Sequence, residues 1–393
     1  MEIEPRVQFD DTSVAFSYKS DKALRKANFI FTIVNNRVVS SVATTLAKYA
    51  LALRLPFAKT VIRNTIFEHF CGGETIEESE KTIVALKKFN VGTILDYSVE
   101  GEHTEPGFDL TTQEILRTIE KAKDNNAVPF CVFKVTGMAD TPLLGKIHSK
   151  ETLTAAESAA FERVRQRVDL LCGKACEYNV RILVDAEETW IQDPIDDLAY
   201  EMMRKYNQQT AIVFNTFQMY RKDMSARLRG AHQDAVRNNY YLGAKLVRGA
   251  YMEKEAARAE QLGYKNPIHE TKEDTDKAFN KALTFCLDSK QRIVFMCGSH
   301  NDYSNKFLTV LMDKHGLKPN DNRVWFAQLL GMSDHISFNL SKAGYNVAKY
   351  VPYGPVKAVM PYLIRRAQEN TSVAGQSSRE LQLIRKELKR RRK

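Results

Sequence analysis

The sequence predicts an α/β fold: a distorted, TIM-like (β/α)8 barrel with an N-terminal helical extension. From Gly92 onwards, eight short apolar runs rich in β-formers alternate with amphipathic stretches of helical period. Such an alternation indicates parallel strands joined by right-handed crossovers. Eight repeats over about 280 residues match the strand count and size of this barrel class. The alternative is a doubly wound open sheet, but no G-x-G-x-x-G follows the first run and no Walker loop is present.

The expected strands are the apolar runs themselves. They are residues 92–97, 129–135, 181–186, 211–217, 244–249, 292–297, 323–327 and 347–351. The helices expected between and after them are residues 112–123, 155–178, 194–206, 226–238, 274–289, 304–315 and 356–370.

The remaining sequence divides the chain into three parts. Residues 1–70 are expected to form a helical arm, with helix formers from Ala23 to Leu55 and a stop at Pro56. Residues 71–373 are expected to form the barrel, and within them Thr75-Ile-Glu-Glu78 is typical of a capping box that begins a helix. Residues 374–393 are expected to form a basic helical tail.

The composition indicates a globular protein. Of its 393 residues, 44% are hydrophobic and 27% are charged. The net charge of +10 comes partly from the tail and is weak evidence for nucleic acid, which we do not expect as a partner. Six scattered cysteines without a C-x-x-C pair indicate reduced thiols in a cytosol-like compartment.

The sequence also bears on the protein's location. No run of about eighteen uncharged apolar residues is present that would span a membrane. Met1-Glu-Ile-Glu-Pro5 resembles neither a secretory signal nor a transit peptide. We expect a cytoplasmic protein, or one at the periphery of the inner membrane, on the matrix side if a eukaryotic presequence is missing.

Polar side chains follow the expected strands, at the ends where barrels of this class carry their active sites. Lys134 ends an otherwise apolar strand, where it is costly to bury without an anionic partner. An ion pair with Asp185 and a contact with an anionic ligand fit equally well. His300 has no second residue with metal-ligand spacing, so we expect no metal site. No G-x-S-x-G motif supports a serine hydrolase.

Two further motifs combine cations with apolar or aromatic residues. In Lys245-Leu-Val-Arg248-Gly249-Ala250-Tyr251, the glycine permits close approach of a flat or phosphorylated ligand, and the arginine and tyrosine suit phosphate and ring contacts. In Tyr362-Leu-Ile-Arg365-Arg366-Ala-Gln-Glu369, both arginines share a helical face with the glutamate. That set suits an amino acid as ligand. The alternative is a solvated face with two ordinary ion pairs.

Together these motifs resemble the proline dehydrogenase family, flavoenzymes with a distorted (βα)8 barrel. The resemblance covers residues 66 to 373 and rests on motifs in family order, namely Val-Asp185-Ala-Glu-Glu, Phe-Gln218-Met-Tyr, the Lys245–Tyr251 run, Gly-Ser-His300-Asn, Gln-Leu-Leu-Gly-Met332 and Tyr-Leu-Ile-Arg-Arg-Ala-Gln-Glu-Asn370. It implies oxidation of L-proline to Δ1-pyrroline-5-carboxylate, with FAD as cofactor and a quinone as electron acceptor. A separate pyrroline-5-carboxylate dehydrogenase would then act downstream. A related flavin barrel acting on 4-hydroxyproline or another cyclic amine is one alternative, and an amino-acid sensor without turnover is another.

The resemblance also implies which residues bind the substrate. Arg365 and Arg366 would clamp its carboxylate, Lys134 would add a third cation, and Glu369 would orient the arginines. The substrate ring would be enclosed by Leu329, Tyr350 and Tyr362, and tyrosine at position 350 is associated with proline rather than hydroxyproline.

For the cofactor, the resemblance places Lys245, supported by Asp185, beside the hydride-accepting nitrogen of the flavin. The catalytic residues it implies are therefore Lys245, Asp185, Arg365 and Arg366, and Asp185 also counts as a substrate contact. The other implied cofactor contacts are Ala186, Gln218, Val247, Arg248, Gly249, Ala250, Tyr251, Thr271, Lys272, Ser299, His300, Asn301 and Glu369.

The sequence departs from the family pattern at three positions. Many members have arginine at position 245 and lysine at position 248, and threonine is common where Ser299 stands. Lysine lacks the planar fork of arginine, so a bidentate contact is not expected from Lys245.

The tail carries Leu381, Ile384 and Leu388 on one helical stripe among basic residues. This stripe is expected either to lie on an anionic membrane surface or to belong to a solvated, frayed helix.

Overall fold

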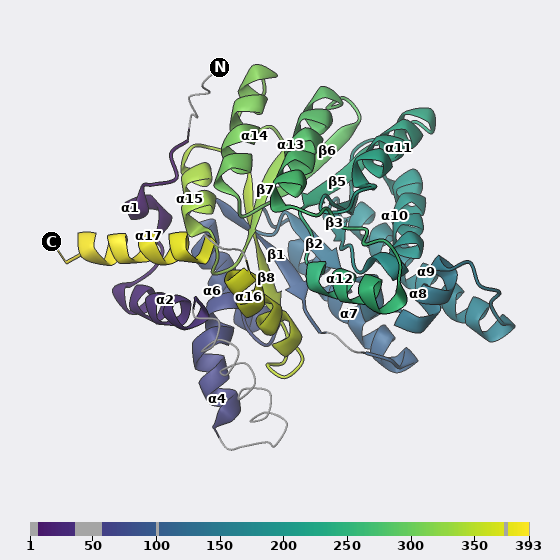
Figure 1. Cartoon of the computed structure of the whole chain (residues 1–393), viewed down its shortest axis with the longest axis horizontal. Coiled ribbons are helices and arrows are strands. Elements are labelled where there is room, and N and C mark those ends of the chain that lie inside the picture. Colours follow the sequence, from purple (N-terminus) through teal and green to yellow (C-terminus); the bar gives the residue numbers. More distant parts are fainter. Residues whose placement is uncertain (1–6, 36–56, 100–101, 373–375, 393) are drawn as a thin grey trace. The chain divides into compact units, whose positions relative to one another are not determined.

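The computed structural model describes residues 7–35, 57–99, 102–372 and 376–392. Eight strands close into a barrel in the order β1 to β8 (Figure 1), which confirms the predicted fold class. They are β1 (Val91–Tyr97), β2 (Phe130–Phe133), β3 (Arg181–Val184), β4 (Val213–Gln218), β5 (Leu242–Val247), β6 (Ile293–Gly298), β7 (Val324–Leu329) and β8 (Val347–Tyr353). Each predicted strand matches one of these, with ends that differ by at most two residues.

These strand pairs are parallel, as the crossover pattern requires. β1 pairs with β8, and the pairs β2–β3, β3–β4, β4–β5 and β5–β6 follow in sequence order. Most strand residues are buried, which explains why the strands appear in the sequence as apolar runs rather than as alternating patterns.

Contacts between residues in space divide the chain into two compact units. The first comprises Gly101–Ser299 and Tyr303–Phe326 and holds β2 to β6 with the start of β7. Its helices are α7 (Glu105–Ala122), α8 (Thr141–His148), α9 (Ala155–Glu177), α10 (Gln192–Tyr206), α11 (Met224–Arg237), α12 (Met252–Leu262), α13 (Lys272–Asp288) and most of α14 (Asp302–Lys314). Short 3-10 turns follow β2 at Val135–Gly137 and precede α10 at Thr189–Ile191.

The second unit comprises Arg6–Glu100, His300–Asp302 and Ala327–Lys393. It holds β1, β8 and the last residues of β7. Its helices are α1 (Thr12–Ala15), α2 (Asp21–Val34), α4 (Ala58–Ile62), a π-helical turn (Arg63–Phe67), α5 (Glu68–Phe70), α6 (Ile76–Lys87), α15 (Asp334–Lys342), α16 (Met360–Ser372) and α17 (Gln376–Arg390). Residues 36–56, which the sequence predicts as helical up to Pro56, lie outside the described residues.

Three helices, α8, α12 and α15, were not predicted. For α12 and α15, the pattern of buried residues explains why. Within α12, only Glu255 and Ala259 are buried, so the segment lacks an apolar period. On α15, eight of the nine residues are buried, so no exposed polar face alternates with an apolar one.

The helix after Thr75 forms as predicted, but its capping box is only half made. The Thr75 side chain accepts from the Glu78 N–H at 3.2 Å, as expected. The Glu78 carboxylate instead accepts from the backbone of Glu74, at 2.9 Å. The reciprocal arrangement forms fully at the start of α9, between Thr154 and Glu157.

The tail helix α17 packs against the N-terminal arm, and Figure 1 shows it beside α1 and α2. Leu381, Leu383 and Ile384 are buried in one cluster with apolar side chains that include Phe16 and Leu24, and Leu388 packs against that cluster. The prediction that this stripe faces a membrane or solvent is therefore wrong, because the arm covers it. A membrane contact by the tail would rest on the basic side chains around the stripe. Among the described helices, none is both long and apolar enough to cross a membrane.

Candidate functional site

Two lysines and one aspartate meet near the ends of three strands: Lys134 follows β2, Asp185 follows β3, and Lys245 lies inside β5, two residues before its end. Asp185 directly follows β3, and its backbone N–H donates to the Phe133 carbonyl at 2.9 Å, which fixes its position. The Lys245 ammonium is almost buried and forms a short ion pair with Asp185 Oδ1. The Lys134 ammonium lies 3.9 Å from Oδ2 of the same carboxylate. The group therefore carries one net positive charge at a strand end, which suits an anionic or electron-rich ligand.

A second acid near this group, Glu187, was not among the predicted site residues. Its carboxylate accepts from the Thr136 N–H at 3.1 Å and from the Thr136 hydroxyl, which ties the segment after β2 to the segment after β3. Burial raises the pKa of Glu187 to about 7. In the sequence it is one of two adjacent glutamates after Asp185, and nothing there marks it as the buried one.

Gln218 ends β4 and has a buried amide whose oxygen, Oε1, has no hydrogen-bond partner among the described residues. Leaving such an acceptor buried and unpaired costs about 1–3 kcal/mol. This is the pattern expected of a residue that hydrogen-bonds a ligand, and it agrees with the predicted cofactor contact.

Gly249 adopts φ +130°, a conformation that favours glycine. A Cβ added there would meet the ring of Tyr220 at 2.5 Å. Packing against Tyr220 is therefore one reason why position 249 requires glycine. The close approach of a ligand to Gly249 stays a prediction.

Two predicted cofactor contacts, Arg248 and Lys272, pair with Asp276 of α13. Arg248 Nε lies 2.7 Å from Asp276, and its other nitrogens donate to Ser299 Oγ at 2.7 Å and to Ser304 Oγ at 2.9 Å. Lys272 pairs with the same aspartate at 2.6 Å. Burial alone would raise the pKa of Asp276, but Lys272 and Arg248 hold it below its usual range. A guanidinium carries five N–H donors, so Arg248 retains two for a ligand beyond these three partners.

These observations fit the cofactor that the sequence implies. Two cations and the start of α13, which Thr271 caps, suit a phosphate-bearing group. The unpaired Gln218 oxygen adds an acceptor suited to a flavin ring. Of the other implied contacts, Ala186 and Tyr251 are buried, Val247 and Asn301 are half-buried, and Ala250 is exposed.

The predicted substrate wall and clamp lie on β7, β8 and α16, in the second unit. Leu329 and Tyr362 belong to one hydrophobic cluster, and the Leu330 N–H donates to the Tyr350 carbonyl at 2.8 Å. Tyr350 and Arg366 are each more than nine-tenths buried. The guanidinium of Arg366 lies 5.2 Å from the centre of the Tyr362 ring, within the range of a cation–π contact.

The neighbouring Arg365 is half-buried. The side chain of Glu369 lies outside the described ones, so its predicted role in orienting the two arginines stays a prediction. The helix itself begins at Met360 rather than directly after Pro355.

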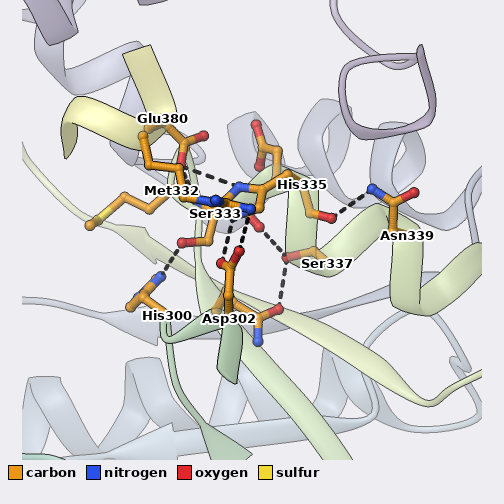
Figure 2. A network of polar contacts seen from close by, with 12 residues as sticks. His300, Asp302, Met332, Ser333, His335, Ser337, Asn339 and Glu380 are labelled. Carbon is orange, nitrogen blue, oxygen red and sulfur yellow. Dashed lines mark hydrogen bonds and ion pairs between the residues drawn. The ribbon is translucent and has the colours of Figure 1, made fainter. Parts of the chain in front are cut away.

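His300 follows β6, and its Nδ1 lies 2.9 Å from Ser333 Oγ (Figure 2). Among the described residues, no group of three or more His, Cys, Asp or Glu side chains could hold a metal ion. Sequence reasoning missed Ser333, because a lone serine after Gln-Leu-Leu-Gly-Met332 carries no motif.

A comparison with protein-family models identifies residues 79–379 as a match to the family described as proline dehydrogenase. The chain belongs to the proline dehydrogenase family. The predicted resemblance is thereby confirmed.

Relatives within this family come from bacteria, plants and animals. The proline dehydrogenase family member described here is 33% identical to mitochondrial proline dehydrogenase 1 of Arabidopsis thaliana, over 84% of this chain and 75% of the relative. It is 44% identical to the human mitochondrial proline dehydrogenase 1, over 64% of this chain and 41% of the relative. It is also 34% identical to the carbapenem antibiotics biosynthesis protein CarD of Pectobacterium carotovorum, over 82% of this chain and 83% of the relative.

Solved structures support the fold. Proline utilization A (PutA) from Bdellovibrio bacteriovorus matches with a TM-score of 0.73 and 18% identity, over 92% of this chain and 38% of that one.

Proposed function

We propose that the protein oxidises L-proline to Δ1-pyrroline-5-carboxylate, with FAD as hydride acceptor and a quinone as the final electron acceptor. Family membership supports proline as the substrate. The observation that carries the proposal is the almost buried Arg366, whose guanidinium lies 5.2 Å from the centre of the Tyr362 ring, while Tyr362 belongs to the cluster against which the apolar Leu329 packs. A guanidinium next to an apolar wall suits a small ring that carries a carboxylate.

Each group of residues then has a chemical task. Arg365 and Arg366 bind the carboxylate, while Leu329, Tyr350 and Tyr362 enclose the ring. Lys134 supplies a further cation. Holding the ring in one orientation lowers the entropic cost of hydride transfer. The reacting amine is neutral and carries one N–H. Proline loses a hydride from the ring carbon beside nitrogen and the proton of this N–H, which leaves a C=N bond.

FAD, when bound, accepts the hydride. We assign its phosphates to Arg248, Lys272 and Ser299, and a ring contact to Gln218. Lys245, held in place by Asp185, provides a fixed cation beside the ring. The other implied contacts complete the proposed cofactor site, and Glu369 is proposed to orient the clamp.

The proposed acceptor places the protein at a membrane that contains quinone. The Arabidopsis and human relatives are named mitochondrial, which supports the matrix side of the inner membrane for a eukaryotic source. The product would be oxidised further by a separate dehydrogenase.

The absorbance spectrum of the purified protein, supplemented with FAD, tests the proposal most directly. Flavin bands should bleach on anaerobic addition of L-proline but not of trans-4-hydroxyproline. Protein that binds no FAD would refute the proposal. Bleaching by hydroxyproline alone would support the alternative substrate.

The clamp is tested by Arg365→Met and Arg366→Met. Each should raise KM for L-proline by about a hundredfold, because a charge-assisted contact contributes up to ~3 kcal/mol. Arg165→Met on α9 is the control, since that arginine is exposed and its ion pairs among the described residues are with the surface glutamates Glu162 and Glu201. An unchanged KM in both clamp variants would show that the arginines do not hold the carboxylate.

A further inference from the structure

The segment between β7 and α15 ends at a residue held in an unfavourable conformation. Ser333 adopts φ +51° and ψ +42°, the left-handed region, which costs a residue other than glycine roughly 1–2 kcal/mol. Such a conformation persists only where its surroundings fix it. Figure 2 shows Ser333 at the centre of a network of polar contacts, all within the second unit.

The tail helix α17 supplies the contact that fixes the Ser333 backbone. The Ser333 N–H donates to Glu380 Oε2 at 2.8 Å, and the carboxylate is almost fully buried. The same oxygen lies 3.8 Å from His335 Nδ1. Burial raises the pKa of Glu380, while its bond from Ser333 and the nearby His335 and Lys349 favour the charged form.

From Ser333 the network continues to His300. The Ser333 hydroxyl lies 2.9 Å from His300 Nδ1, so one serine links Glu380 through its backbone and His300 through its side chain. A hydrogen bond at Nδ1 restricts the orientation of the imidazole plane.

Two further contacts, one from α15 and one from α17, reach the segment that carries His300. Asp302 lies two residues after His300 and accepts from His335 Nε2 at 2.9 Å. Its other oxygen pairs with Arg379 at 2.6 Å. Arg379 and Glu380 are adjacent on α17, so one turn of the tail helix contacts both the Ser333 loop and the His300 segment.

The loop is also held by a residue of β8. Lys349 of β8 donates to the carbonyls of Leu329, at 3.2 Å, and Met332, at 2.5 Å. It also pairs with Asp334 at 2.9 Å. With contacts from α17 and from β8, the loop has little freedom to move. Removing one of these contacts should therefore shift Ser333 and the His300 ring that it contacts.

We infer that Glu380 is a positioning residue for His300: through the Ser333 N–H and hydroxyl, the tail helix α17 sets the orientation of the imidazole. The matched family region ends at residue 379, so Glu380 lies outside it. The inference rests on the proposed function only in taking His300 to contact the flavin. The link from Glu380 to His300 is independent of any cofactor.

Nitrogen NMR of the histidine rings in the full-length protein, without added flavin, tests this link. His300→Asn assigns the His300 signals. Glu380→Ala removes the acceptor for the Ser333 N–H and should shift those signals, whereas Glu380→Gln keeps an acceptor oxygen and should leave them near their original positions. Glu387→Ala is the matched control, because Glu387 is a buried acid on the same helix that pairs with Arg390 and Arg391 instead.

Unchanged His300 signals in a folded Glu380→Ala protein would overturn the inference. If that variant does not fold, Ser333→Ala decides the matter. It keeps the backbone bond to Glu380 and removes the hydroxyl, so unshifted His300 signals in that variant would also refute the linkage. A shift of equal size in Glu387→Ala would show a general loss of packing and would overturn the inference as well.

Titration with FAD, followed by flavin fluorescence, tests the consequence for the proposed site. Glu380→Ala should weaken FAD binding about tenfold, equivalent to ~1.4 kcal/mol, and Glu380→Gln by no more than about twofold. If the unmodified protein binds no FAD, the proposed function fails while the NMR result still stands. If the His300 signals shift in Glu380→Ala but the affinity for FAD does not change, the inference that this orientation matters for flavin binding is overturned.

Discussion

Replacing Lys349 with methionine removes the cation from a fully buried ion pair and leaves its partner behind. The side chains of Lys349 and Asp334 are 0% and 1% exposed, and their charged atoms lie 2.9 Å apart. Burial alone would raise the pKa of Asp334, but Lys19 and Lys349 together hold it well below its usual range. Among the described residues, Lys19 and the Tyr18 hydroxyl would remain as polar partners of this buried carboxylate in the variant.

Breaking a buried pair by removing one partner costs ~3–5 kcal/mol. Lys19 remains 3.1 Å from Asp334, so we expect the lower end, about 3 kcal/mol. Loss of the donor to the Leu329 and Met332 carbonyls acts in the same direction. Urea unfolding followed by circular dichroism should show a midpoint lowered by ~1 M or more, given typical slopes.

Lys342→Met on α15 is the matched control for this variant. That lysine is 66% exposed and lies 3.8 Å from Asp11, so its loss should change stability by less than ~1 kcal/mol. The double variant Lys349→Met/Asp334→Asn should recover part of the loss, since the fully buried carboxylate is then gone and Lys19, whose side chain is 9% exposed, is the charge that loses its partner. If Lys349→Met proves as mild as Lys342→Met, the pair does not stabilise the fold and the reasoning fails.

Two further predictions concern the first unit. The pKa of Glu187 is raised to about 7 from 4.5, so folding favours its protonated form. The stability that this preference contributes is fully present below pH 4.5. The free energy of unfolding should therefore fall by up to ~3 kcal/mol as pH rises to above 7. Urea unfolding at several pH values should show a flatter dependence for Glu187→Gln but not for the Glu188→Gln control, and parallel curves would contradict the assignment. Gly249→Ala should lower stability by ~2–3 kcal/mol because of its positive φ and the clash with Tyr220. Gly145→Ala, in an open position on α8, should instead raise it by ~0.5–1 kcal/mol, and thermal unfolding compares the two; equal effects would refute the argument.

The strands were predictable because each is a short buried run bounded by polar residues. The helices were predictable only where one face meets solvent, which is why α15 escaped notice. Within the site, Lys134 and Asp185 were identified because each is a charged residue that ends an apolar strand. Their 3.9 Å separation matches the ion pair, one of the two interpretations left open for Lys134.

Contacts between distant parts of the sequence were not predictable. Glu380 and Ser333 are 47 residues apart, and neither stands in a recognisable motif. The apolar spacing of α17 was visible, but the surface that covers it was not. A stripe of leucines defines a face to be buried and does not specify its partner.

The packing of α17 on α1 and α2 has a consequence for how the protein is made. Phe16 and Leu24 are translated before every barrel strand, whereas Leu381 and Ile384, with which they share a cluster, are translated after all of them. The apolar surfaces of Phe16 and Leu24 therefore lack these partners while the barrel is translated, a period in which nascent chains are prone to aggregate. The arm can complete its core only once α17 has left the ribosome.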